Sequence, residues 1–139
     1  MFETVVVGAD GSPTAADAVR QAIELVKLTG GRLHIVSAYT PHNLTGGGGE
    51  FAKSLRTEDL AQSVVDDLAS QATIAGVPVE THRKAGSPAD AICEVAEEVK
   101  ADLIVVGNKG MTGVRRVLGS VPNSVAHQAP CAVLIAATT

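Results

Sequence analysis

The sequence predicts one α/β domain over residues 1–139, built on an open five-stranded parallel sheet with helices on both faces. Short, continuous apolar runs alternate with longer amphipathic segments, and strands that are buried on both faces of a parallel sheet have such runs. Glycines or a Ser-Pro pair separate most runs from the segments that follow. No internal repeat or linker divides the chain, so we expect a single domain.

The first strand and first helix have the clearest boundaries. A strand is predicted at Thr4 to Gly8, where Val5–Val7 is wholly apolar. Ser12 and Pro13 then supply an N-cap and a first helical residue. The predicted apolar stripe of this helix consists of Ala15, Val19, Ala22, Ile23 and Val26. Gly30-Gly31 ends the helix.

The middle of the chain contains two predicted strands and a long helix. The second strand is expected at Leu33 to Ala38 or Tyr39, before a glycine-rich loop at Thr40–Gly49 that is suited to closing over a ligand. A helix follows from about Phe51 to Ala75. Its predicted buried stripe consists of Leu60, Val64, Leu68 and Ala72 or Gln71. Gly76–Pro78 breaks it before a third strand at Val79 to Lys84.

The last third repeats the pattern. Ser87 and Pro88 begin a helix whose predicted buried residues are Ile92, Val95, Ala96 and Val99. A fourth strand ends at Gly107, a short helix is expected near Ser120 to Ala129, and a last strand at Cys131 to Ala136. Right-handed crossovers favour the strand order 3-2-1-4-5. The first and fourth strands are then neighbours, and ligands bind beyond the carboxyl ends at such a point.

Composition and patterning disfavour several classes of function. Lys and Arg total 11 against 15 Asp and Glu, and the net charge of −4 with three aromatic residues makes nucleic-acid binding unexpected. No secretory leader or apolar run of about 20 residues is visible, so we expect a cytoplasmic protein without membrane contact. Cys93 and Cys131 have small or apolar neighbours, as expected of reduced, structural thiols.

Neither a metal site nor a catalytic group is indicated. The four histidines are distributed over different predicted elements without a spacing typical of metal ligands: His34, His42, His82 and His127. The P-loop, G-x-G-x-x-G and G-x-S-x-G patterns are missing from the sequence. No side chain is identifiable as a general base, so any ATP hydrolysis is expected to be slow or incidental.

Two glycine segments in the last third suggest a phosphate-binding cradle. Gly107–Gly110 follows the fourth strand, and Gly119-Ser120 opens a helix whose free N–H groups attract negative charge. Nearby cations for the phosphates are Lys109, Arg115 and Arg116. Asp10, after the first strand, suits hydrogen bonds from ribose hydroxyls or an adenine amino group. Its alternative role is a turn aspartate that accepts from Ser12 or the next helix.

These residues resemble the universal stress protein family over the whole chain. Val7–Ser12 is similar to its first strand and turn, and Gly107–Gly110 with Gly119-Ser120-Val121 is similar to its nucleotide-binding pattern G-x2-G-x9-G-[ST]. The resemblance implies a Rossmann-like fold, similar to adenine nucleotide alpha hydrolases, and binding of ATP, with or without Mg²⁺. The nucleotide-binding residues so implied are Ala9, Asp10, Ala38, Gly107, Asn108, Lys109, Gly110, Arg116, Gly119, Ser120 and Val121.

The resemblance also implies a stress-response homodimer, joined through Cys131 to Ala136, with a regulatory protein partner that the sequence does not identify. Cyclic AMP is an alternative ligand, because Ser37–Tyr39 and Gly119–Pro122 resemble members that bind it. Met111–Leu118 is one residue shorter than the family's pattern. Either this turn tightens and the cradle survives, or affinity is reduced; a dimeric module that works without nucleotide therefore remains a further alternative.

Overall fold

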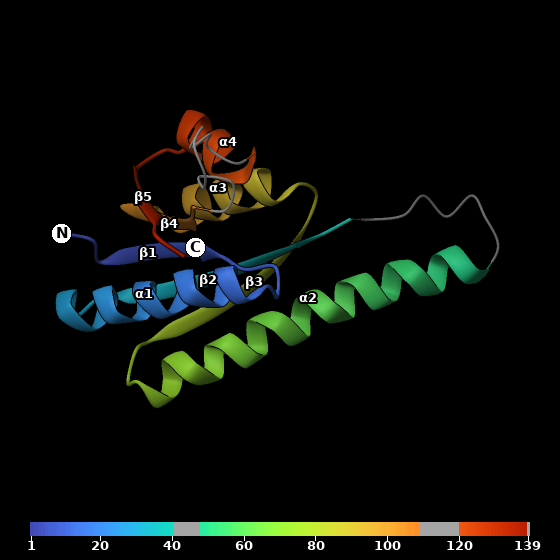
Figure 1. Ribbon diagram of the computed structural model, residues 1–139, viewed down its shortest axis with the longest axis horizontal. Coiled ribbons are helices and arrows are strands. Elements are labelled where there is room, and N and C mark those ends of the chain that lie inside the picture. Colours follow the sequence, from blue (N-terminus) through green and yellow to red (C-terminus); the bar gives the residue numbers. More distant parts are fainter. Residues whose placement is uncertain (41–47, 109–119, 139) are drawn as a thin grey trace.

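The computed structural model describes residues 1–40, 48–108 and 120–138, without the side chains of 48–56. Within these ranges the chain forms a five-stranded parallel sheet of order β3-β2-β1-β4-β5 (Figure 1). The strands are β1 (Thr4–Gly8), β2 (Arg32–Tyr39), β3 (Val79–Ala85), β4 (Leu103–Gly107) and β5 (Ala132–Ala136). The helices are α1 (Pro13–Thr29), α2 (Gly48–Ile74), α3 (Pro88–Glu98) and α4 (Ser120–Gln128). The predicted fold class and strand order are confirmed.

Helices cover both faces of the sheet, which explains why its central strands are apolar throughout. Figure 1 shows α1 and α2 on one side of the sheet and α3 and α4 on the other. Val5 and Val7 face the α1 side, whereas Val6 between them faces the α3 side, because side chains alternate along a strand. Leu33 and Ile35 join the first core, and Val36 joins the second.

The two predicted helix starts have the expected caps. The Ser12 hydroxyl accepts the Ala15 N–H at 3.2 Å, and the Ser87 hydroxyl accepts the Asp90 N–H at the same distance. A proline follows each capping serine, where its missing N–H has no helical partner. Gly30 ends α1 in a left-handed conformation with φ of 75°.

The predicted stripe of α2 was wrong by one position at its start. The buried residues are Ala61, Val65, Leu68 and Ala72, whereas Leu60 is 66% exposed. A spacing of four residues drifts around a helix by about 40° per step, while steps of four, three and four stay on one face. The helix also begins at Gly48, inside the predicted loop. Residues 41–47 of that loop lie outside the described residues.

The first helix shows a smaller difference. Its buried stripe includes Ala18 in place of the predicted Ala15. Ala15 is half-buried, near the carboxyl end of the sheet. In the described ranges, no helix has the length and hydropathy needed to cross a bilayer.

Candidate functional site

A pocket opens at the carboxyl ends of β1, β2 and β4, where the strand order predicts a ligand crevice. Its volume is about 130 Å³. Residues at or after the three strand ends line it: Gly8, Ala9, Asp10, Val36, Ala38, Val106 and Gly107. The remaining walls come from the start of α1 and from α3 and α4: Ser12, Thr14, Ala15, Pro88, Ile92, Val121 and Pro122. Most of this surface is apolar, as is usual for a site that takes a flat organic ring.

The structure brings several of the predicted nucleotide-binding residues to this pocket. Those that line it are Ala9, Asp10, Ala38, Gly107 and Val121. Asn108 and Ser120 directly follow or precede lining residues but are not themselves in the lining. The others, Lys109, Gly110, Arg116 and Gly119, lie outside the described residues, as do Arg115 and the short turn at Met111–Leu118.

The floor of the pocket depends on a close approach between Gly8 and Ile92. A Cβ atom added to Gly8 would lie 2.4 Å from Ile92 Cδ1, so a larger residue here would push the Ile92 side chain of α3 away from the end of β1. The Ala9 N–H then donates to the Val36 carbonyl at 2.8 Å, which joins the ends of β1 and β2. Ile92 was predicted only as a core residue, although the glycine that ends the apolar run of β1 indicated a close approach at this point.

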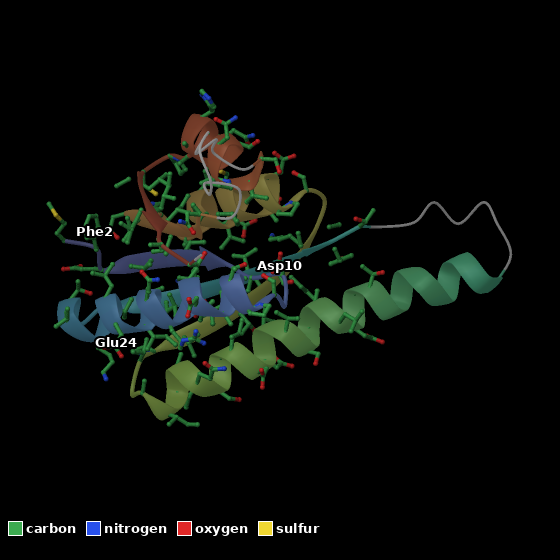
Figure 2. All side chains as sticks on the ribbon, in the orientation of Figure 1. Phe2, Asp10 and Glu24 are labelled. Carbon is green, nitrogen blue, oxygen red and sulfur yellow. The ribbon has the colours of Figure 1, made fainter. Side chains whose placement is uncertain are left out.

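Asp10 lies where β1 ends and the chain turns toward α1 (Figure 2). Its Oδ1 accepts the Ser12 N–H at 2.9 Å, the turn bond that was the alternative interpretation of this residue. A carboxylate has several acceptor positions, so this bond is compatible with contact to a ligand hydroxyl. The turn therefore holds an exposed carboxylate at the mouth of the pocket.

The end of β4 is tied to the carboxyl-terminal segment. Asn108 Oδ1 accepts the Thr138 N–H at 2.8 Å and the Thr138 hydroxyl at 3.0 Å. A Cβ atom at Gly107 would lie 3.0 Å from Thr138 Oγ1, so this glycine allows Thr138 to approach. Gly107 and Asn108 were predicted to bind nucleotide, and the structure shows that both also contact Thr138. Asn108 and Thr138 are 30 residues apart in the sequence, so no local pattern predicts the hydrogen bond between them.

The first turn of α4 borders the same pocket. Val121 and Pro122 line it, and Ser120 is the exposed first residue of the helix. The first N–H groups of a helix have no internal partner and lie at the positive end of its dipole. An anion at this border would therefore be stabilised. The pocket thus combines an apolar floor with an acidic side chain and a helix N-terminus.

The two cysteines lie on the α3 side of the sheet, Cys93 within α3 and Cys131 just before β5, at the amino end of the sheet. Burial, helped by Asp90 and Glu97, raises the pKa of the Cys93 thiol, and burial likewise raises that of Cys131. Both are free, and each packs in the α3-side core. Thiols of this kind are weakly nucleophilic.

Comparisons with known proteins agree on one family. The family model described as the universal stress protein family matches residues 1–137. A universal stress protein of Mycobacterium tuberculosis is 38% identical over 144 residues, covering 99% of this chain and 98% of the relative. One from Methanocaldococcus jannaschii is 32% identical over 140 residues, covering 97% of this chain and 82% of the relative. A universal stress protein crystallised in complex with cAMP is 35% identical with a TM-score of 0.80, covering 99% of both chains.

Proposed function

Because this chain belongs to the universal stress protein family, we propose that it binds an adenine nucleotide in the pocket at the carboxyl ends of β1 and β4. The observation on which this rests is the composition of that pocket. Ala38 and Ile92 supply apolar surface for the adenine ring, and Asp10 is placed to accept from a ribose hydroxyl. The first turn of α4 lies where phosphate would follow.

Two nucleotides are candidates for this pocket, and they differ in the charge of their phosphate end. The resemblance in sequence favours ATP, whose several negative charges need Mg²⁺ or the cations of residues 109–116 beside an acidic protein. The relative crystallised with cAMP favours the cyclic nucleotide, whose single negative charge the α4 N-terminus alone can match. Binding of ATP should therefore depend on Mg²⁺ and salt more strongly than binding of cAMP.

The proposed role is regulatory, as a stress-response homodimer in the cytoplasm that passes its nucleotide state to a protein partner. The exposed edge strand β5 supports a dimer: Leu134 is 43% exposed, and Val133 and Ile135 are only partly buried. An apolar sheet edge that stays uncovered favours aggregation. This role requires no hydrolysis of the nucleotide.

Calorimetric titration with ATP, AMP, cAMP and GTP tests the proposal. We expect one adenine nucleotide per chain and affinity for GTP at least about tenfold weaker, a difference of about 1.4 kcal/mol. Ala38→Trp should weaken binding at least about 100-fold, because the indole occupies the place of the base. Ala85→Trp, at the exposed end of β3, is the matched control. No heat with any adenine nucleotide would contradict the proposal and favour the nucleotide-independent module.

A further inference from the structure

Two histidines on neighbouring strands contact each other outside the nucleotide pocket. His34 Nδ1 of β2 lies 3.0 Å from His82 Nε2 of β3. In the strand register His34 is opposite Glu80, and His82 is two residues further along on the same face. Glu80 Oε2 lies 3.6 Å from His34 Nδ1. The proposed nucleotide site uses none of these side chains.

The separations among the three ligand atoms approach those around a tetrahedral metal ion. No two of them are more than 4.8 Å apart. Two nitrogens bound to Zn²⁺ at about 2.0–2.1 Å with tetrahedral angles lie about 3.3 Å apart, and a nitrogen and a carboxylate oxygen lie about 3.4 Å apart. The observed 3.0 Å and 3.6 Å need changes of about 0.2–0.3 Å to meet them. The third separation, between Glu80 and His82, is at most 4.8 Å, and rotation of the exposed Glu80 side chain can shorten it.

The two facing ring nitrogens are joined by a hydrogen bond, in which one of them carries the proton. Because a metal ion binds a ring nitrogen through its lone pair, the ion would replace this proton, and each neutral ring would then carry its proton on its other nitrogen. The neighbouring charges are Arg32, Lys84 and Glu98, and Glu98 is paired with Lys84 at 2.8 Å.

The cluster has both a rigid base and an opening. The His34 side chain is only 4% exposed and is held in the face covered by α3, whereas the Glu80 side chain is 68% exposed. Because β3 is an outer strand of the sheet, no further described strand covers Glu80 and His82. An ion can enter from solvent and keep water in its remaining position.

We propose that His34, Glu80 and His82 bind a divalent transition-metal ion, with Zn²⁺ as the best match. Two imidazoles and one carboxylate form a donor set that zinc proteins use, whereas Mg²⁺ prefers oxygen ligands throughout. The bound ion joins the outer strand β3 to β2, and so it stabilises the folded protein by an amount that rises with the logarithm of the free ion concentration above Kd.

Calorimetry and thermal unfolding of the full chain, stripped with a chelator and free of nucleotide, test this site with Zn²⁺ and Mg²⁺. We expect one Zn²⁺ per chain, a rise in Tm with Zn²⁺ and no response to Mg²⁺. Glu80→Gln and His82→Gln should each weaken Zn²⁺ binding at least about tenfold. Glu80 is exposed, so its variant retains the fold. His127→Gln, on the exposed surface of α4, is the matched control.

Three results would overturn the site. The first is the lack of Zn²⁺ binding up to about 1 mM, which corresponds to only about −4.1 kcal/mol. The second is an affinity that neither Glu80→Gln nor His82→Gln changes. The third is Zn²⁺ binding that disappears in Cys131→Ser, because a thiolate site would then account for it. Nucleotide titrations of the same variants should match the parent protein, so this site and the nucleotide site can fail independently.

Discussion

The two ends of the sheet are built differently. At the amino end, loops are fastened to strands by short backbone bonds, and little space remains between them. At the carboxyl end, a pocket opens beyond the ends of β1, β2 and β4. Figure 2 shows Phe2 near the first end and Asp10 at the second. Mutations at the amino end should therefore lower the stability of the protein, whereas mutations that alter the pocket should change the affinity for nucleotide.

The bonds of the amino end connect three strands. Asp102 Oδ2 and Oδ1 accept the N–H groups of Glu3 and Thr4, each at 3.0 Å. The Arg32 N–H donates to the Glu3 carbonyl at 2.7 Å, and the Asp102 N–H donates to the Thr4 carbonyl at 3.0 Å. These contacts link the starts of β1, β2 and β4.

Gly31→Ala should have the largest effect, entirely on stability. A Cβ atom at Gly31 would lie 2.3 Å from the Glu3 carbonyl oxygen and 2.7 Å from its Cα, and these backbone atoms cannot rotate away. We expect a loss of about 3 kcal/mol in the free energy of unfolding, measured by urea denaturation. The variant that remains folded should bind nucleotide with unchanged affinity.

The neighbouring glycine is the matched control. Gly30 has a φ of 75° and nothing within 4 Å of an added Cβ, so Gly30→Ala meets only backbone strain of about 1 kcal/mol. Equal losses at the two positions would contradict the packing argument. An altered affinity in folded Gly31→Ala would contradict the separation of the two ends.

Most of the fold was predictable from the sequence because its signals are local. The apolar runs of β1 and β4 and the Ser-Pro starts of α1 and α3 each occupy a few consecutive residues. The failures involve relations between elements. Leu60 was misplaced because several faces of α2 contain apolar residues, and the tertiary contact selects one.

The same reason limits what was predictable about the sites. Asp10 and Gly107 could be assigned to one crevice because the strand order makes β1 and β4 neighbours, whereas Ala38 was implied only by the family resemblance. The approach of His82 to His34 depends on the register of β3 against β2, which spacing along the chain does not determine. The bond between Asn108 and Thr138 likewise joins segments that are distant in sequence.

Asp102→Asn should have the second largest effect, again at the amino end. Burial raises the pKa of Asp102, but the N–H donors of Glu3 and Thr4 outweigh this and hold it below its ordinary value of 3.8. Asparagine keeps one acceptor and turns an NH₂ group toward the other donor. We expect a loss of about 2 kcal/mol at pH 7, measured by urea denaturation.

The pH dependence of stability in the parent protein and in Asp102→Asn tests the same role of the carboxylate. The pKa of Asp102 is lower in the folded protein than in the unfolded chain, so the unfolded chain takes up the proton first as pH falls. The contribution of the ionised carboxylate to the free energy of unfolding is therefore complete above pH 3.8 and is lost as pH falls through the folded pKa. The stabilities of the parent protein and Asp102→Asn should therefore converge below this range. A constant difference at all pH values would contradict a role for the ionised carboxylate.

Asp10→Asn should change nucleotide affinity rather than stability, because Asp10 lies at the carboxyl end of the sheet and lines the pocket. Asparagine retains an acceptor for the Ser12 N–H, so the turn and the stability should change little. Loss of the charged acceptor should weaken nucleotide binding about tenfold by calorimetry, or about 1.4 kcal/mol. Asp90→Asn, in the first turn of α3, should leave affinity unchanged. If Asp10→Asn binds nucleotide as the parent does, Asp10 is a turn residue alone.

The smallest effects should come from the two capping serines, which both follow the carboxyl end of a strand but differ in whether they line the pocket. Ser12→Ala and Ser87→Ala remove caps of equal length, 3.2 Å, so each should lower the free energy of unfolding by about 1 kcal/mol. Only Ser12 lines the pocket, so only Ser12→Ala should also weaken nucleotide binding. Equal affinities in the two variants would mean that a pocket position can serve stability alone, and that position at the carboxyl end is insufficient to predict a role in binding.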